Sequence, residues 1–424
     1  MRTLLVLAVL LTGVPVLAQQ TIQVSPMLET QPVVGTGPVV QGAALWMHPT
    51  DPSSSLLLVA DNQTGLLVYN LNGTARPLLA EGAVQGVDVQ EGVVVGGISQ
   101  TLVMVANTTA QALIGYIIDP ATLEFRRAGF ANVTAPSFAP SSVALYVSPA
   151  TGRVFAFAGS ATGLVEQFEL TAQTDGGTAS AVVRSFDVGN AVVGLAVDDA
   201  QGKLYVVEQS VGIWEYGAEP EATDIRVSVD TVTGGGLSQP LGGVALYRAS
   251  GVRGYLLAVN GGDSAVRIYE RQPGAHTFRG SFTVGADGGI DAVESPRQVV
   301  ATNRSLGTLF PLGLVAVHDS TNAGTNENFK LVPWPAIATG FTTPLVVDTG
   351  PVDTTDGGTA DGGTTDGGSS GPIGNVPPPT PSAESPEGGV TTGQNCVCAS
   401  ASVPGTLLLA LLGVLLLSRR RPGA

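Results

Sequence analysis

Alternating apolar and polar positions recur along the chain in short segments at a nearly constant spacing. Six segments share one pattern and read GLLVYNL (65–71), LIGYIID (113–119), LVEQFEL (164–170), GIWEYGA (212–218), AVRIYER (265–271) and GLVAVHD (313–319). Equivalent positions in successive copies, from Tyr69 to Val317, lie 47 to 53 residues apart. A period near fifty residues with strand-type alternation is typical of one propeller blade. The sequence therefore predicts an all-β fold, a six-bladed β-propeller of four-stranded antiparallel blades.

A second repeat places a small residue before a short apolar-rich strand in each unit. Its copies begin at Gly42, Gly86, Ser142, Gly194, Gly243 and Gly289. Small residues suit positions where neighbouring backbones approach closely. We interpret this repeat as the innermost strand of each blade, with its polar positions facing a central channel.

Composition supports turn-rich β-structure and limits the partners. The 424-residue chain has 56 glycines, only 12% charged residues and a formal net charge of −15. An acidic chain without a basic patch repels nucleic acid and anionic lipid, so we expect no nucleic-acid partner. Lys203 and Lys330 are the only lysines in the chain.

The two ends of the chain carry the features of sorting signals. Residues 1–18 combine Arg2, an apolar run and a Val-Leu-Ala end, which predicts a signal peptide cut after Ala18. The propeller is expected over residues 30–345. Residues 346–395 are rich in Asp, Gly, Thr and Pro and are expected to form a disordered, flexible linker. Residues 396–424 contain Cys396 and Cys398, an apolar stretch long enough for a transmembrane helix, and three arginines.

This last segment resembles the MYXO-CTERM sorting signal of myxobacteria. The resemblance implies cleavage near the cysteines, followed by display at the cell surface or release. The alternative is a permanent C-terminal membrane anchor. Either way the chain is expected to be exported, and to contact a membrane through its C-terminal helix before processing. We expect the propeller itself to be a monomer.

The propeller segment resembles the β-propeller phytases. The matching segments, in the same order, are ALWMHP (44–49), TGLLVY (64–69), VEQFEL (165–170), GYLLA (254–258), IYER (268–271) and NFKLVPW (328–334). The resemblance implies a secreted six-bladed enzyme of the 3-phytase type, which uses calcium to hydrolyse phosphate monoesters of phytate. In such chemistry hard oxygen ligands hold the ions, the ions activate a water, and basic and tyrosine side chains hold the phosphates.

Five residues match positions where the resemblance implies calcium ligands or lie near strand ends. They are Asp88, Asp291, Glu208, Gln209 and Asp61. We expect Asp88 and Asp291 to lie mid-strand on the channel face, with either a calcium or a polar-network role. Asp61 and Asp319 have an alternative reading as turn residues. Asp198 and Asp199 are expected in a solvated hairpin turn.

Most other site positions implied by the resemblance hold neutral residues. Positions where the family has basic or tyrosine side chains hold Asn62, Gln63, Thr108, Ser141 and Ser160. Positions where it has acidic side chains hold Gln41, Gly42, Val193, Pro240, Gly242 and Gly288. His48, His276 and His318 show no metal or triad spacing, and no other catalytic motif is present.

Two functions follow from these observations. The first is a calcium-dependent hydrolase acting on phytate or another phosphorylated small molecule. The second is a non-catalytic propeller, displayed at the surface, that binds a ligand or partner. A third idea is a purely structural envelope protein. Catalytic residues are not identified by the sequence.

Overall fold

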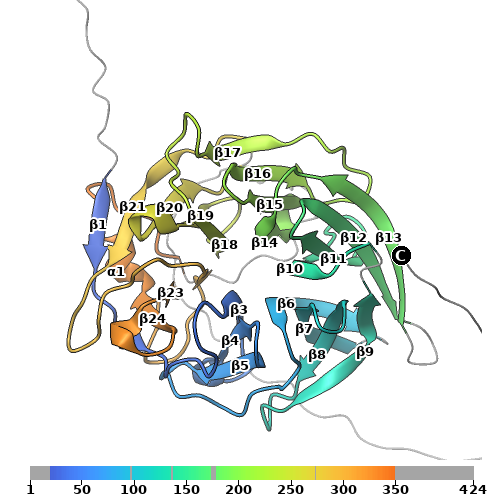
Figure 1. The fold of residues 1–424 in the computed structure, drawn as a ribbon, viewed down its shortest axis with the longest axis horizontal. Helices are drawn as coiled ribbons and strands as arrows, with labels where there is room; N and C mark the ends of the chain where they lie inside the picture. The colour runs from blue at the N-terminus through green and yellow to red at the C-terminus, as the bar shows by residue number, and fades with distance from the viewer. Residues whose placement is uncertain (1–19, 96–97, 135–136, 173–177, 273, 349–424) are drawn as a thin grey trace, which may run out of the picture. The chain divides into compact units, whose positions relative to one another are not determined.

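Six sheets form a closed circle around a central axis (Figure 1). The computed structural model describes residues 20–95, 98–134, 137–172, 178–272 and 274–348. The predicted signal peptide, the C-terminal helix with its arginines and almost all of the predicted linker lie outside these residues. No helix within the described ranges is long and apolar enough to cross a membrane.

The first four sheets follow one another along the chain. Blade 1 contains β3 (Val40–Trp46), β4 (Leu56–Asp61) and β5 (Gly65–Asn70), and two isolated bridges, Leu66–Leu79 and Tyr69–Ala75, extend it. Blade 2 contains β6 (Val84–Val95), β7 (Ile98–Asn107), β8 (Ala112–Ile118) and β9 (Phe125–Thr134). Blade 3 contains β10 (Pro140–Val147), β11 (Val154–Ser160), β12 (Leu164–Ala172) and β13 (Thr178–Asp187). Blade 4 contains β14 (Val192–Asp198), β15 (Lys203–Glu208), β16 (Gly212–Gly217) and β17 (Val227–Thr231).

The last two sheets include strands from the N-terminal segment. Blade 5 contains β18 (Leu241–Arg248), β19 (Gly254–Asn260), β20 (Ala265–Glu270) and β21 (Phe278–Val284), and β1 (Thr21–Val24) adds to β21 in parallel. Blade 6 contains β22 (Val299–Thr302), β23 (Leu314–Asp319) and β24 (Asn328–Pro333), and β2 (Leu28–Glu29) is its outermost strand. Both N-terminal strands precede residue 30, the boundary expected from the sequence. They close the circle by joining the start of the chain to its last two blades.

The prediction of a six-bladed propeller is confirmed, but the prediction for the strands of the sixth blade is wrong. Residues 285–298 contain no strand, so the segment at Gly289 is a loop, and β22 is the innermost strand. The segment GLVAVHD forms β23, the second strand of its blade, whereas the other five copies form third strands. The cause is β2, which supplies the outer strand, so the C-terminal part of the chain contributes only three strands.

The small residues of the second repeat do lie at close approaches between innermost strands. A Cβ atom on Gly42 would come within 2.9 Å of Gly86 Cα, and one on Gly86 would come within 3.1 Å of Ser142 Cα. On the far side of the circle, a Cβ on Gly194 would lie 3.0 Å from Gly243 Cα. Any larger side chain at these positions would push neighbouring blades apart.

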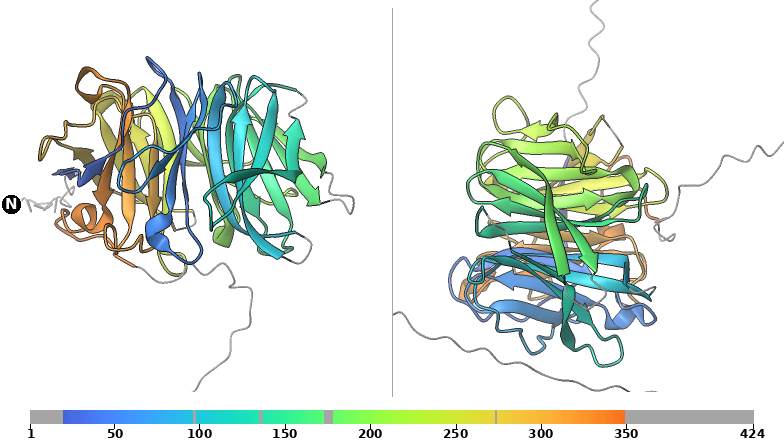
Figure 2. Two further views of the ribbon diagram at one scale, coloured as in Figure 1. Left: turned by 90° about the horizontal axis from the view of Figure 1, so that it is seen from below. Right: turned by 90° about the vertical axis from the view of Figure 1, so that its right-hand side faces the viewer.

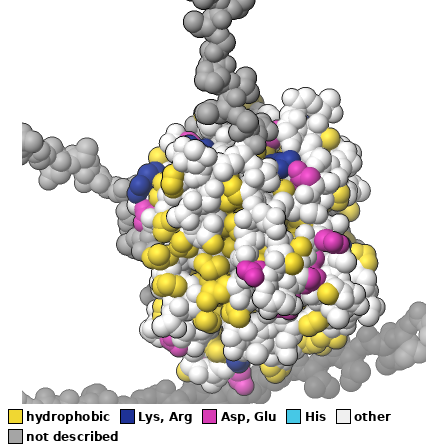
Figure 3. Space-filling view, turned by 90° about the vertical axis from the view of Figure 1, so that its left-hand side faces the viewer, with side chains coloured by type: hydrophobic (Ala, Val, Ile, Leu, Met, Phe, Trp, Pro, Cys, Tyr) yellow, Lys and Arg dark blue, Asp and Glu magenta, His cyan; other side chains and the backbone are white. Residues whose placement is uncertain are grey.

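The core consists of one hydrophobic cluster at each junction between neighbouring blades. At the junction of blades 5 and 6, the Trp334 ring from the short helix α1 (Trp334–Ala338) stacks on Tyr247 with the ring centroids 3.9 Å apart. Figure 2 shows the blades from the side, with their strands running between the two ends of the propeller. We call the end where the innermost strands begin the upper rim and the opposite end the lower end. Figure 3 shows hydrophobic side chains grouped on the side that carries β1 and α1, with few basic side chains among them.

Candidate functional site

The second strand of every blade ends at the upper rim in a buried polar residue. These residues are Asp61, Asn107, Ser160, Glu208, Asn260 and Asp319. Most of them stabilise the turn that follows: Asp61 Oδ1 accepts hydrogen bonds from the amides of Gln63 (2.8 Å) and Thr64 (2.9 Å). The turn interpretation of Asp61 and Asp319 therefore has direct structural support. The other oxygen of this carboxylate, Asp61 Oδ2, is buried and has no hydrogen-bond partner within the described part of the chain.

Glu208 and Gln209 lie on the upper rim of blade 4. Glu208 Oε2 accepts hydrogen bonds from Trp214 Nε1 (2.8 Å) and Arg226 Nη1 (3.2 Å), and its Oε1 accepts one from Asn190 Nδ2 (2.9 Å). Arg226 stacks over the Trp214 ring, with 3.9 Å between its Cζ and the ring centroid. Gln209 is exposed. Glu208 is thus held by donors from its own blade and by the segment that precedes it.

Asp88 lies far from the rim, in the middle of β6. It is four residues from Val84, the first residue of the strand, which corresponds to roughly 13 Å along a strand. Its Oδ2 accepts a hydrogen bond from the Leu145 amide (2.7 Å) on the neighbouring innermost strand. Burial raises the pKa of Asp88 to about 6, although that hydrogen bond and the positive charge of Arg248 act in the opposite direction. The expected mid-strand position of Asp88 is confirmed.

Polar contacts cross the channel near its lower end. Gln90 of blade 2 donates a hydrogen bond to Asp199, which adjoins blade 4 (3.2 Å). Glu91 of blade 2 pairs with Arg304 of blade 6 at 2.6 Å. Asp199 does lie in the turn, η2 (Asp199–Gln201), but it is half-buried and its Oδ1 also accepts a hydrogen bond from the Val147 amide (3.0 Å). Burial raises the pKa of Asp199, so the turn is as predicted but its carboxyl is not fully solvated. These contacts join non-adjacent blades across the channel.

Asp291 lies in the loop between β21 and β22, which corrects the expectation that it lies mid-strand. Its Oδ1 accepts a hydrogen bond from Lys330 Nζ. Lys330 is fully buried and also contacts Glu29 and Asp319. Burial alone would lower the pKa of Lys330, but the hydrogen bonds to Asp291 and Glu29 outweigh it and raise the pKa above its usual value.

A cavity of about 210 Å³ opens on the upper rim where blades 1 and 6 meet. It is lined by Gly37, Pro38, Arg297, Ser320, Thr325, Asn326 and Glu327. The loops before β3, before β22 and before β24 supply these residues. They bring together parts of the chain nearly 300 residues apart, and for this reason periodicity alone gave no sign of the cavity.

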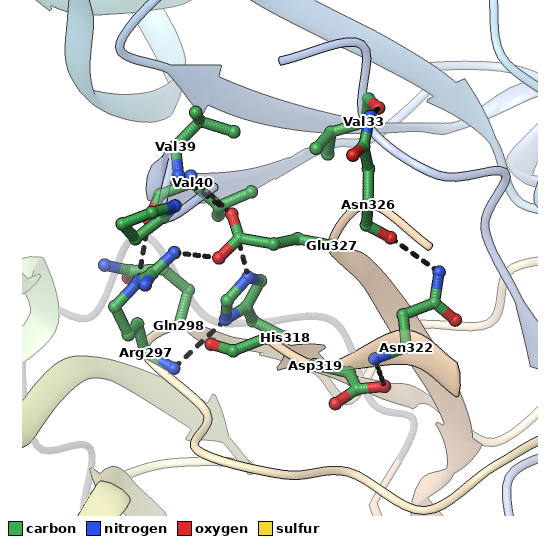
Figure 4. A network of polar contacts seen from close by, with 12 residues as sticks. Val33, Val39, Val40, Arg297, Gln298, His318, Asp319, Asn322, Asn326 and Glu327 are labelled. Atoms are coloured by element: carbon green, nitrogen blue, oxygen red, sulfur yellow. Dashed lines mark hydrogen bonds and ion pairs between the residues drawn. The ribbon is translucent and has the colours of Figure 1, made fainter. Parts of the chain in front are cut away.

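Glu327 is the centre of a polar network beneath this cavity (Figure 4). Its Oε2 accepts hydrogen bonds from the amides of Val39 (3.0 Å) and Val40 (2.9 Å) of blade 1. Its Oε1 accepts a hydrogen bond from Arg297 Nη2, and Arg297 Nε donates to the Val40 carbonyl (3.2 Å). Burial would raise the pKa of Glu327, but His318, the Val40 amide and Arg297 together hold it below its usual value.

His318 completes the network from the end of β23. Its Nδ1 accepts a hydrogen bond from the Arg297 amide (3.2 Å), so in the neutral ring the proton is on Nε2. Nε2 lies 3.6 Å from Glu327 Oε2, beyond hydrogen-bond distance, and has no hydrogen-bond partner among the described residues. Burial, followed by the nearby charge of Arg297, lowers the pKa of His318. The spacing of His318 along the sequence indicates no partner, because its partners are brought close only by the fold.

The expected calcium ligands do not form a common coordination shell. Asp61 and Glu208 lie on different blades of the rim, Asp88 is deep in the channel, and Asp291 is bonded to Lys330. Among the described residues, no group of three or more His, Cys, Asp or Glu side chains is arranged to hold a metal ion. Calcium needs six to eight oxygen ligands, several of them from the protein. The donors of this chain therefore do not fit a calcium cluster at these positions.

Arginines of the upper rim are likewise engaged with carboxylates. Arg297 pairs with Glu327, Arg226 with Glu208 and Arg267 with Asp263. Of these three arginines, Arg297 is the one that also lines the cavity. Since a guanidinium has five N–H donors, it keeps donors for a ligand after these bonds are made.

The fold and the rim define a six-bladed propeller with a small polar cavity at the end where its innermost strands begin. Comparison with known families gives a match between residues 2–353 and the Phytase family model. The chain belongs to the phytase family. It is 27% identical over 327 residues to a 3-phytase of Bacillus subtilis (strain 168), which covers 74% of this chain and 85% of that protein.

Solved propellers are more distant. The β-propeller domain of Myceliophteria thermophila Cps50 (Swd1) is 13% identical, with a TM-score of 0.39, and covers 69% of this chain and 83% of that one. BBS1N, in a complex with ARL6DN, is also 13% identical, with a TM-score of 0.37, and covers 65% of this chain and 75% of that one. Likenesses this distant carry no argument about function.

Proposed function

We propose that this protein is a phytase-like hydrolase that acts on phosphate monoesters, with inositol phosphates such as phytate as its substrate class. The observation that carries the proposal is the family relationship, which extends over the whole described propeller and includes 85% of the length of a 3-phytase. The cavity lined by Arg297 is the proposed phosphate site. It lies on the upper rim and offers a guanidinium, two hydroxyls and a carboxamide beside the Glu327 carboxylate.

Within this cavity, the chain's own residues have defined roles. Arg297 would bind the phosphate group through its remaining N–H donors, because a planar guanidinium matches phosphate oxygens. Glu327 and the Val40 carbonyl orient the Arg297 side chain. Glu327 also neutralises part of its charge, so we expect weak binding of a single phosphate group, with the rest of the inositol ring outside the cavity.

Calcium dependence follows from the family resemblance alone. Bound calcium would supply positive charge and an activated water for phosphoryl transfer. Because the donors of this chain do not fit such a cluster, no step is derived through the metal. Export and display at the cell surface are likewise proposals, and they rest on the sequence of residues 1–18 and 396–424.

The second candidate function is a propeller that binds a ligand or partner without catalysis. This second function is favoured because the rim arginines form ion pairs with the rim carboxylates, and these pairs stabilise the fold. Two assays on the same preparation separate the two functions: release of phosphate from phytate, and calorimetric binding of inositol hexasulfate, which resists hydrolysis. Phosphate release supports the hydrolase, whereas binding without release supports the second candidate.

A further inference from the structure

The Glu327 carboxylate is held by donors of the kind with which proteins bind phosphate and other oxyanions. Two consecutive backbone amides, those of Val39 and Val40, donate to its Oε2 at 3.0 and 2.9 Å. The Arg297 guanidinium donates to its Oε1. Backbone N–H groups and guanidinium groups that converge on one point form anion-binding sites. In this protein the anion at that point is a side chain of the chain itself.

A fourth donor faces the same carboxylate without forming a hydrogen bond to it. His318 Nε2 lies 3.6 Å from Glu327 Oε2, and Figure 4 shows the ring facing the carboxylate. The His318 side chain is fully buried, and its Nε2 has no hydrogen-bond partner in the described part of the chain. In the neutral ring this nitrogen carries the proton, because Nδ1 accepts a hydrogen bond from the Arg297 amide.

The donors at this point thus outnumber those that the two oxygens of Glu327 satisfy. Leaving a buried N–H group without an acceptor is unfavourable. A phosphate group presents more acceptor oxygens than a carboxylate does, and they point in tetrahedral directions. A tetrahedral oxyanion can therefore accept from the amides, the guanidinium and His318 Nε2 together.

An anion from solution can reach these donors through the cavity on the upper rim. Arg297 and Glu327 both line the cavity, and 28% of the Arg297 side chain is exposed. Among the lining residues, Glu327 is the one carboxylate and Arg297 is the one cationic side chain. If the Glu327 carboxylate moves away, the charge of the cavity wall becomes positive.

We propose that these four donors form one binding site for a tetrahedral oxyanion, and that the Glu327 carboxylate occupies this site when no ligand is bound. A phosphate group first meets the remaining N–H donors of Arg297. It gains the two amides and His318 Nε2 only when Glu327 moves away, and this competition keeps the affinity of the wild-type protein low. The inference rests on the proposed phosphate site at Arg297, but it concerns binding and not hydrolysis.

The test is the binding of inorganic phosphate to full-length wild type and Glu327→Ala, measured by calorimetry at constant ionic strength. Glu327→Ala is expected to bind phosphate at least about tenfold more tightly, because the anion no longer competes with a carboxylate. The matched control is Glu169→Ala, which removes a carboxylate that also pairs with an arginine, Arg153, on blade 3. Its phosphate affinity is expected to stay within about twofold of wild type, because no cavity donors are freed.

Acetate gives a second readout, which tests the position of the anion rather than the charge of the protein. Acetate carries the group that Glu327→Ala removes, so it can bind the same donors. Replacing chloride by about 50 mM acetate is expected to raise the melting temperature of Glu327→Ala by at least about 2 °C, and that of wild type and Glu169→Ala by less than about 1 °C. Equal responses of the two variants would show that a lost charge is the cause and would overturn the proposal.

Glu327→Gln covers the case in which Glu327→Ala does not fold. The carboxamide keeps the length of the side chain and an oxygen for the amides of Val39 and Val40, but it removes the charge that pairs with Arg297. We expect Glu327→Gln to bind phosphate roughly threefold or more tightly than wild type, and we expect adding Arg297→Met to abolish this gain. A gain that persists in the double variant would overturn the proposal.

The outcome for binding is separate from the outcome for hydrolysis. If wild type releases phosphate from phytate but no folded Glu327 variant binds phosphate more tightly, this inference is wrong and the proposed hydrolase stands. If a Glu327 variant binds phosphate more tightly and wild type releases none, the oxyanion site is supported and the proposed hydrolase is contradicted.

Discussion

Arg271 and Asp198 form a fully buried ion pair that joins blades 4 and 5. Arg271 Nη2 lies 2.7 Å from Asp198 Oδ1, and the side chains are 1% and 0% exposed. Arg271 Nη1 also donates to the carbonyls of Gly251 and Arg253, both at 2.9 Å. The remaining donors of the guanidinium are thus satisfied by the backbone of blade 5, which is the condition under which a buried pair is tolerated.

Replacing one partner of this pair should strongly destabilise the propeller. Arg271→Met leaves the Asp198 carboxylate buried without its cation, and we expect a loss of about 3–5 kcal/mol in the free energy of unfolding. The matched control is Arg153→Met, which breaks the more exposed pair with Glu169 and should cost less than about 1 kcal/mol. Denaturant unfolding of the three proteins measures the difference. Equal losses in both variants would show that the buried pair has no special role.

The junction of blades 1 and 6 should weaken in mild acid because of His318. Its folded-state pKa is lowered, so the folded state disfavours the proton that the unfolded chain binds. The folded state therefore keeps its full stability with respect to His318 above about pH 6.5, the ordinary pKa of histidine. That stability is lost as the pH falls from there toward the folded-state pKa.

The variant His318→Gln removes this titration. We therefore expect the free energy of unfolding of wild type to fall more steeply between pH 7 and pH 5 than that of His318→Gln. Denaturant unfolding at three pH values in this range measures both slopes. Parallel slopes would contradict the lowered pKa of His318. The pKa of Glu327 is also lowered. Its ionised carboxylate therefore contributes to the free energy of unfolding down to more acidic solution, and this contribution is lost only below 4.5, its ordinary pKa.

Asp88 should have the opposite pH dependence. Burial raises its pKa to about 6, so the folded state binds a proton more tightly than the unfolded chain does. Protonated Asp88 therefore contributes fully to the free energy of unfolding below pH 3.8, the ordinary pKa of this carboxyl. This contribution is lost as the pH rises through about 6.

Asp88→Asn keeps an acceptor for the Leu145 amide and removes the charge. We expect this variant to be more stable than wild type at pH 8, by roughly 1–3 kcal/mol, and to lose that advantage toward pH 4. Chemical unfolding at both pH values is the measurement. A variant that is less stable than wild type at pH 8 would show that the Asp88 charge is needed in the channel.

The sequence predicts the architecture well because propeller geometry imposes requirements on short segments of the sequence. Close approach of the innermost strands demands small residues, and Gly42, Gly86 and Ser142 occur where the strands meet. The prediction fails at the sixth blade, because closure by β2 shifts the strand order there by one. No local pattern shows that a strand near residue 28 pairs with one near residue 331.

The polar site is predicted less well, because its partners come from distant parts of the chain. Arg297, His318 and Glu327 meet Val40 across the closure of the circle, and Arg271 meets Asp198 across 73 residues. Carboxylates that look like solvated turn residues in the sequence, such as Asp198, are buried by the next blade. A single period detects which residues repeat, but not which ones the neighbouring blade covers.

The most direct test of the proposed function is the release of phosphate from phytate by wild type, Arg297→Met and Arg127→Met. Arg127 is the matched control, since it also pairs with a glutamate but lies on blade 2 and is 49% exposed. The full-length proteins are assayed with millimolar calcium and, separately, with chelator, and their melting temperatures are compared to verify folding. We predict release by wild type and Arg127→Met in at least one buffer, and at least about a tenfold loss with folded Arg297→Met, equivalent to about 1.4 kcal/mol of transition-state stabilisation. No release by wild type in either buffer would contradict the proposal that this propeller is a hydrolase.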